Sequence, residues 1–137
     1  MRLLVMLLLV TSCAKIVVLE DPLSVSEHLD LGYLYEKQGS LDLAEKEYKK
    51  ALKKDPKNFL ALFNLGNVYA KKGDYTVAEK FYREALAVKE DPDVLNNLAY
   101  VLYKQGRREE ALIFIKRALQ MKNSETYRQT LREIEGH

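Results

Sequence analysis

The stretch LGYLYEKQGSLDLAEKEYKKAL, residues 31–52, recurs at residues 65–86 as LGNVYAKKGDYTVAEKFYREAL and at residues 98–119 as LAYVLYKQGRREEALIFIKRAL. The second copy follows the first at an offset of 34 residues, and the third follows at 33. A fixed period of this length indicates repeated supersecondary units that bury their apolar faces against their neighbours. The sequence therefore predicts a stack of three similar units.

Each unit is predicted to be two helices joined by a tight turn. Ser24 and Glu27 have the spacing of a capping box at the start of the first helix, and Gly39 is expected to end it. Asp55-Pro56 is expected to stop the second helix. Further helix caps are predicted at Ser40, Asn58 and Asp74.

Small residues are predicted at the points where the two helices of a hairpin cross. They are Gly32, Gly66 and Ala99, faced by Ala44, Ala78 and Ala111. Tyr48 and Tyr82 are expected to fill the gap to the next unit. Since no unit can bury its apolar stripe alone, the stack itself creates the core.

These features resemble the tetratricopeptide-repeat family, with its small residue at position eight, aromatic residue at eleven, alanines at twenty and twenty-seven, and closing proline. The resemblance spans residues 21–121, and the implied fold is all-α. It is a right-handed α-solenoid of three helix-turn-helix hairpins, at about residues 25–58, 59–91 and 92–122. The chain departs from the family pattern at His28 and Leu62, which stand where Trp is usual, and at Pro92, which is displaced.

Residues 123–137 are predicted to form a capping helix and a short tail. Tyr127, Leu131 and Ile134 share one face of this helix, and the opposite face is charged. Open solenoids require such a polar-backed cap at their ends.

The N-terminus carries a short apolar run at residues 3–10, preceded by Arg2. Such a run spans about 12 Å as a helix, far less than a bilayer core of about 30 Å, and matches the apolar region of a signal peptide. Val10-Thr11-Ser12-Cys13 follows and resembles the lipobox of bacterial lipoproteins. The resemblance implies a signal peptide at residues 1–12, a lipid on Cys13 and a tether at residues 13–20. Two alternatives remain, an uncleaved anchor over residues 3–19 and a plain buried segment.

Composition and residue types argue against several functions. The formal charge is only +2, from 22 basic and 20 acidic side chains, so nucleic acid is not an expected partner. The two histidines, His28 and His137, have no accompanying ligand set, and His28 is expected to pack between helices. Cys13 is the single cysteine, so no intramolecular disulfide can form. We expect no enzyme activity, no cofactor, no metal and no small-molecule substrate.

In the family that the chain resembles, the first helix of each hairpin lines a concave surface. By position, the resemblance implies a partner-binding groove formed by Tyr33, Lys37, Phe63, Asn64, Asn67, Lys71, Asn96, Asn97, Tyr100, Tyr103 and Lys104. Asn side chains can pair with both the N–H and the C=O of an extended backbone, and Tyr supplies contact area at low entropic cost. The alternative is that Phe63 and some tyrosines only pack between neighbouring first helices.

The carboxylate clamp of chaperone-binding relatives is not present in this sequence. Leu29 and Phe63 stand at its first lysine position, and Asp93 and Asn97 stand where basic residues would be needed. A C-terminal acidic peptide is therefore not the expected ligand. A protein or an extended peptide segment is expected instead.

The sequence thus predicts a non-catalytic adaptor in the bacterial cell envelope, held by lipid at the outer membrane and facing the periplasm. An inner-membrane signal anchor is the alternative location. The alternative function is an accessory subunit of an envelope or cell-wall enzyme. The lysines of residues 49–57 are either a solvated convex face or a contact for anionic headgroups.

Cys13→Ala is expected to leave an unprocessed precursor, because the thiol that accepts the lipid is removed. The wild-type chain should take up labelled palmitate and partition into detergent. An intact Met1 in the mass spectrum of the wild-type protein would refute the signal-peptide interpretation.

Overall fold

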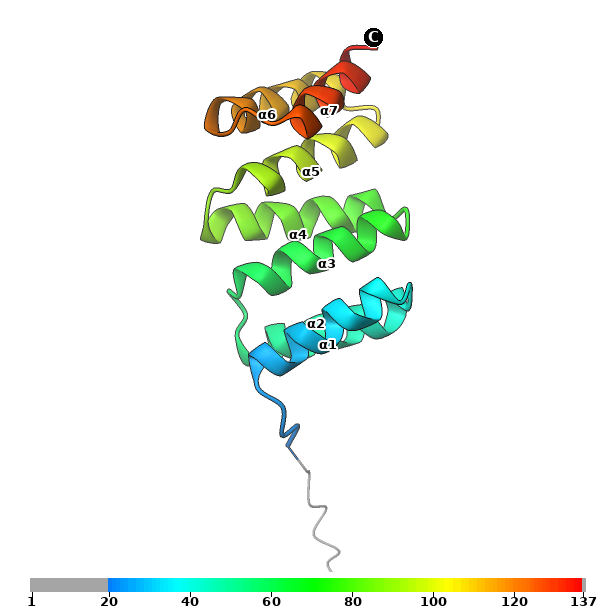
Figure 1. The fold of residues 1–137 in the computed structure, drawn as a ribbon, viewed down its shortest axis with the longest axis vertical. Helices are drawn as coiled ribbons and strands as arrows, with labels where there is room; N and C mark the ends of the chain where they lie inside the picture. The colour runs from blue at the N-terminus through cyan, green and yellow to red at the C-terminus, as the bar shows by residue number, and fades with distance from the viewer. Residues whose placement is uncertain (1–19, 137) are drawn as a thin grey trace, which may run out of the picture.

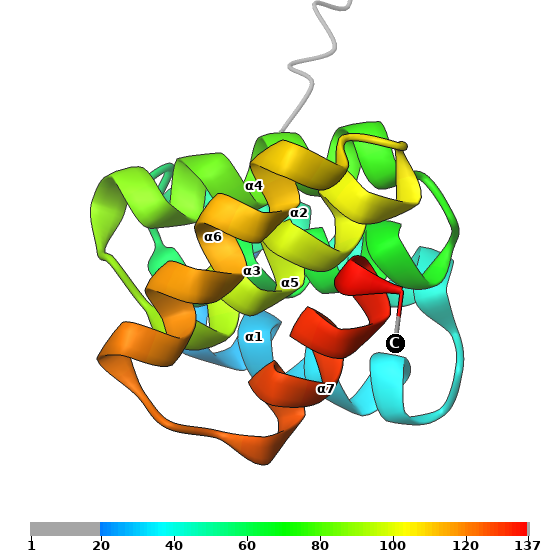
Figure 2. The ribbon, with the colours of Figure 1, turned by 90° about the horizontal axis from the view of Figure 1, so that it is seen from above.

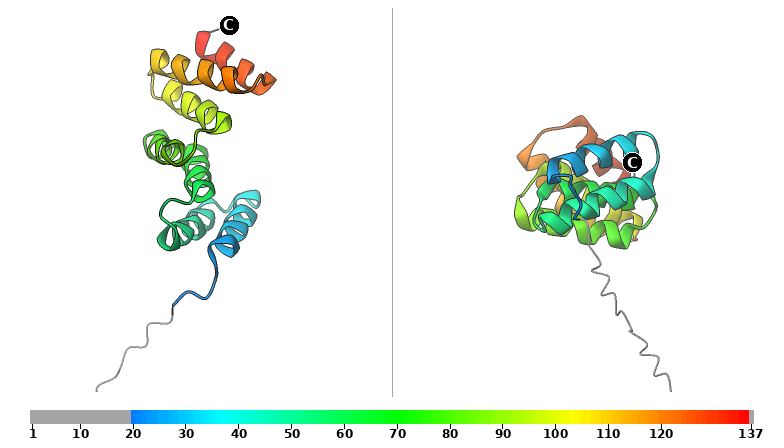
Figure 3. Two further views of the ribbon diagram at one scale, coloured as in Figure 1. Left: turned by 90° about the vertical axis from the view of Figure 1, so that its left-hand side faces the viewer. Right: turned by 90° about the horizontal axis from the view of Figure 1, so that it is seen from below.

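The computed structural model describes residues 20–136, and this part of the chain is all-α, as predicted (Figure 1). Its helices are α1 (Val25–Lys37), α2 (Leu41–Lys54), α3 (Phe59–Lys71), α4 (Tyr75–Val88), α5 (Pro92–Lys104), α6 (Arg108–Met121) and α7 (Glu125–Glu135). The first six pair as three hairpins, which stack one after another along the long axis (Figures 1 and 3). The described chain begins at one end of this stack, and α7 lies at the other.

The backbones of the first helices approach one another along the stack, and those of the second helices do not. Some Cα atoms of α1 and α3, and of α3 and α5, lie within 8 Å, whereas within residues 20–136 no Cα atoms of α2 and α4 or of α4 and α6 do. Long side chains still meet between α4 and α6, where Arg83 pairs with Glu110 at 2.5 Å. The second helices therefore fan apart, and the face formed by α1, α3 and α5 curves inward. We call this face the groove.

The predicted capping box is confirmed, because Ser24 accepts from Glu27 N and the Glu27 side chain accepts from Ser24 N. Gly39 ends the turn after α1 with φ of +76°, a conformation that favours glycine. The predicted cap at Ser40 is wrong, since its side chain makes no capping hydrogen bond. Asp74 has a similar backbone conformation and does accept from Val77 N at 3.3 Å. The backbone at Ser24, whose side chain does cap its helix, is extended with ψ of 168°, whereas Ser40 has ψ of 67°.

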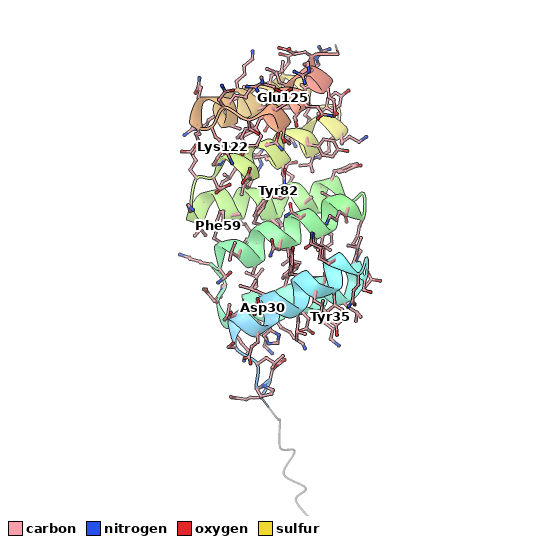
Figure 4. All side chains as sticks on the ribbon, in the orientation of Figure 1. Asp30, Tyr35, Phe59, Tyr82, Lys122 and Glu125 are labelled. Atoms are coloured by element: carbon pink, nitrogen blue, oxygen red, sulfur yellow. The ribbon has the colours of Figure 1, made fainter. Side chains whose placement is uncertain are left out.

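Glycine at position eight of a unit makes room for the tyrosine of the same hairpin. A Cβ atom on Gly32 would lie 2.4 Å from Cε1 of Tyr48, and one on Gly66 would lie 2.4 Å from Cε1 of Tyr82. The tyrosines were expected to fill the gap to the next unit, and Tyr48 does share a cluster with residues of α3. The rings therefore pack on their own hairpin and on its neighbour, and side chains fill the spaces between hairpins (Figure 4).

Two glutamates 34 residues apart, Glu45 and Glu79, join each hairpin to the next. Glu45 of α2 accepts from the Tyr69 hydroxyl at 2.6 Å and pairs with Lys72 at 2.6 Å. Glu79 of α4 accepts from Gln105 at 3.0 Å and pairs with Arg107 at 2.6 Å. Burial raises the pKa of the Glu45 carboxyl, but hydrogen bonds from Lys49, Lys72 and Tyr69 outweigh burial and lower this pKa to about 2. The pKa of Glu79 is lowered for the same kind of reason.

The helix α7 packs against α5 and α6, as Figure 2 shows from above. Tyr127 and Ile134 are 2% and 1% exposed, and Leu131 packs partly buried against the same core. The Tyr127 hydroxyl donates to Asp93, and Arg108 donates to the carbonyl of Glu135. The predicted capping helix is therefore a packed part of the stack.

Truncation after Asn123 is expected to lower the melting temperature by at least about 10 °C and to promote aggregation. The apolar burial lost with Tyr127, Leu131 and Ile134 is about 4–8 kcal/mol before ordering costs. Replacing Gln129 and Glu133, which are exposed on the other face, by Ala is the control and should hardly change the melting curve. An unchanged curve after truncation would mean that α7 contributes nothing to the fold.

Replacing Glu45 by Gln is expected to lower the melting temperature at pH 7 by roughly 3–6 °C. This shift corresponds to a loss of about 1 kcal/mol in the free energy of unfolding. Because the folded-state pKa of Glu45 is lowered, its stabilisation is complete above the ordinary value of 4.5. This stabilisation is lost as the pH falls from about 4.5 towards 2. The wild-type and variant melting temperatures should therefore converge in acid, while the exposed control Glu133→Gln follows the wild type throughout. A constant difference between pH 7 and pH 3 would contradict the prediction.

Candidate partner-binding groove

The groove holds a cavity of about 290 Å³ between the second and third units. Its lining residues come from α1, α3, α4 and α5 and are Glu36, Asn67, Ala70, Lys71, Tyr82, Asn97 and Tyr100. The cavity thus brings together residues that are far apart in the sequence. Its lining combines carboxamides, tyrosines and one lysine–glutamate pair.

A chain of hydrogen bonds fixes the carboxamide of Asn67. Its Oδ1 accepts from the Tyr82 hydroxyl at 2.8 Å and from Asn97 Nδ2 at 2.9 Å. Asn97 Oδ1 in turn accepts from Asn96 Nδ2 at 3.1 Å. Both lone pairs of Asn67 Oδ1 are used, so the polar group that Asn67 can offer to a ligand is its N–H donor pair.

Burial keeps the tyrosine hydroxyls next to the groove protonated. It raises the pKa of Tyr82, and burial together with the charge of Glu36 raises the pKa of Tyr48. The Tyr48 hydroxyl donates to Glu36 Oε2 at 3.0 Å, and Lys71 Nζ lies 2.5 Å from Glu36 Oε1. The Glu36 carboxylate therefore connects the first unit to α3 at the edge of the cavity.

The cavity contains four of the predicted groove residues, namely Asn67, Lys71, Asn97 and Tyr100. Tyr33 is exposed by 56% further along α1, with the Lys37 ammonium 5.2 Å from its ring centroid. Lys104 lies 5.9 Å from the Tyr100 centroid.

Several predicted groove residues lie in the packing instead. Phe63 contacts the rings of Phe59 and Tyr82, which supports the packing alternative for this residue. Asn96 is only 8% exposed, and its Oδ1 has no hydrogen-bond partner within the described chain. Tyr103 is partly buried against the main core, and Asn64 is half-buried. The remaining predicted site, Cys13, lies outside the described residues.

The sequence interpretation assigned Tyr82 to the core and did not assign its hydroxyl to the groove. A buried Tyr hydroxyl usually finds a partner, and this general rule was the available signal. Glu36 and Ala70 also line the cavity. They stand at the same position of the first two units, on the first-helix face that was expected to be concave.

A second polar cluster surrounds His28 at the start of the stack. The side chain is fully buried, with Nδ1 2.8 Å from Glu47 Oε2 and Nε2 3.3 Å from Asp21 Oδ1. Lys50 pairs with the same two carboxylates, at 3.0 and 3.4 Å. The cluster holds residue 21 against α1 and α2. Among residues 20–136, no group of three or more His, Cys, Asp or Glu side chains is placed to hold a metal ion, and no helix is both long and apolar enough to cross a bilayer.

Two family models described as tetratricopeptide repeat match residues 29–94 and 70–133. Together they span residues 29–133, and the chain belongs to the tetratricopeptide-repeat family. A comparison with curated protein sequences found no match.

Solved structures have the same fold. The first tetratricopeptide domain of Spaghetti (RPAP3), bound to the HSP90 peptide SRMEEVD, is 24% identical with a TM-score of 0.80, over 85% of this chain and 94% of that one. The first such domain of human RPAP3 is 24% identical with a TM-score of 0.78, over 82% and 90%. YrrB, described as a tetratricopeptide protein with an unusual peptide-binding site, is 26% identical with a TM-score of 0.70, over 77% and 58%.

Proposed function

We propose that this chain is a non-catalytic adaptor whose groove binds an extended segment of a protein partner. The observation that carries the proposal is the cavity in which Asn67 has a fixed carboxamide oxygen and free N–H donors beside an exposed tyrosine, Tyr100. An extended backbone presents carbonyl oxygens that such donors can bind. YrrB, a relative with a described peptide-binding site, supports the same kind of ligand.

We also propose that lipid on Cys13 holds the chain at a membrane, because residues 10–13 resemble a lipobox. The proposed location is the outer membrane, facing the periplasm. An inner-membrane signal anchor is the alternative. Residue 21 is held at the end of the stack away from α7, so a tether leaving from there would keep the groove accessible. Assembly of an envelope complex, such as a pilus, secretion or outer-membrane complex, fits an adaptor of this kind. An accessory subunit of an envelope or cell-wall enzyme is the second candidate.

Site-specific photo-crosslinking tests which face meets the partner. A photoreactive amino acid in place of Tyr100, in the groove, should give a crosslinked product in cells. The same amino acid in place of Lys53, exposed on α2, is the control and should give none. Crosslinking from Lys53 and not from Tyr100 would contradict the groove assignment.

Asn67→Asp combined with Tyr100→Ala is expected to weaken partner binding by about 2–4 kcal/mol, as the loss of interface anchors does. The Asp side chain keeps an oxygen for Tyr82 and Asn97 but replaces the donor group with an acceptor. Melting temperature should therefore change by no more than a few degrees, whereas Asn67→Ala would leave the Tyr82 hydroxyl without its partner.

The matched control is Lys46→Ala with Lys53→Ala on the convex side, which should leave the affinity unchanged. The affinities of the groove variant and of the control variant can be measured by calorimetry, with the partner that crosslinking identifies. Full affinity in the groove variant would refute the proposed function, and an unfolded Asn67→Asp, Tyr100→Ala protein would show that these side chains belong to the core.

A further inference from the structure

Each first helix of the stack ends in a lysine at the same position of its unit. These lysines are Lys37, Lys71 and Lys104, and they form the lysine row. They are 34 and 33 residues apart and all are exposed, so the row follows the long axis of the stack along one edge of the groove. A basic residue near a helix C-terminus favours the helix dipole. Other helices share this effect, since the last turn of α2 holds Lys53 and Lys54, but the lysines of the row end the helices that form the groove, and Lys71 lines its cavity.

Aromatic rings and one carboxylate hold the ends of these side chains. The Lys37 ammonium lies 5.2 Å from the Tyr33 centroid, and the Lys104 ammonium lies 5.9 Å from the Tyr100 centroid. Lys71 instead pairs with Glu36 at 2.5 Å. The positive charge available to a ligand is therefore largest at Lys37 and Lys104 and smallest at Lys71.

We propose that the groove selects a segment in the polyproline II conformation that carries an acidic side chain at every third residue. This inference rests on the proposed function, since it names the class of segment that the same groove takes. The acidic side chains would face the lysine row, and backbone carbonyls would face the N–H donors of Asn67.

The spacing of the units selects this conformation. Packed helices lie about 8–10 Å apart, so successive lysines of the row repeat at about this distance. A polyproline II helix advances about 9.3 Å in three residues, which returns side chains i and i+3 to the same face. A β-strand returns its side chains to one face after two residues, at about 6.7 Å, and would lose register with the row. Polyproline II also leaves its carbonyl groups free for Asn67.

The ligand differs in kind from a C-terminal acidic peptide. The basic positions of a carboxylate clamp hold Leu29, Phe63, Asp93 and Asn97, so nothing there would bind a terminal carboxylate. The lysine row lies at the C-terminal ends of the first helices and is open along its length, which suits side chains within a segment.

The test uses the purified full-length chain and synthetic 13-residue Pro-rich peptides with blocked ends and three Glu residues each. The Glu residues are spaced by two, three or four positions, and affinity is measured by fluorescence anisotropy. Spacing by three should bind about tenfold tighter than the other two spacings, and the preference should fall as salt is raised. Lys37→Gln with Lys104→Gln should remove the preference, whereas Lys71→Gln should reduce it least. Equal affinity for the three spacings would overturn the inference.

A random peptide library displayed on phage separates failure of this inference from failure of the proposed function. Selection is made on the wild-type chain and on the Asn67→Asp, Tyr100→Ala variant. A peptide depends on the groove when it binds the wild-type chain and not the variant. Such peptides that carry acidic residues at three-residue spacing support the inference. Peptides that need the groove but show no such spacing overturn the inference and leave the proposed function in place. Selection of no peptide that depends on the groove overturns both.

Discussion

The close contact between a glycine and a tyrosine ring inside each of the first two hairpins is the constraint on which the rest of the stack depends. Any Cβ atom on Gly32 or Gly66 would overlap the ring of Tyr48 or Tyr82, so the two helices can reach their observed separation only with glycine there. Each ring is then fully buried and also meets the next hairpin. One contact therefore sets both the geometry within a hairpin and the spacing between hairpins. The third unit has Ala99 in place of the glycine and Ile115 in place of the tyrosine. The larger Ala is thus accommodated by the smaller Ile.

This packing also determines the chemistry of the groove. A buried tyrosine needs a partner for its hydroxyl, and Tyr48 and Tyr82 find theirs in Glu36 and Asn67, on the face formed by the first helices. The oxygen of Asn67 is thereby occupied and its donors are left for a ligand. Tyr33 and Tyr100 stand at the position of Asn67 in the first and third units and are 56% and 38% exposed. The groove is thus asymmetric because the second unit places an Asn at this position, where its oxygen binds the hydroxyl of the core tyrosine.

The repeat period, the helix caps at Ser24, Asn58 and Asp74, and the small residues at the crossings were enough to predict an all-α stack. They were enough because each depends on local sequence and on the period alone. The groove was predicted only in part, since the periodicity names the face of a helix but not which side chains a neighbouring helix covers. Asn96 and Asn97 are adjacent in sequence, and only the packing makes the first buried and the second a groove residue. The hydroxyl of Tyr82 reaches the groove from the second helix, which no pattern along the first helices could indicate.

The two ends of the stack are closed in different ways. The difference is seen at equivalent positions of the first and last units. Val94, Leu98 and Val101 of α5 are buried against the preceding hairpin, and α7 presents Tyr127, Leu131 and Ile134 at the same spacing to cover the last one. Within residues 20–136 no hairpin precedes the first unit, and Leu34, equivalent to Val101, is 50% exposed. There the chain relies on polar contacts, with buried His28 between Glu47 and Asp21 in place of an apolar residue such as Leu62. An apolar side chain could pack at this position, whereas His28 adds a polar side chain between Glu47 and Asp21, which Lys50 and Lys54 of α2 also contact. The first unit is thus built to hold the incoming chain, and the last to close the core.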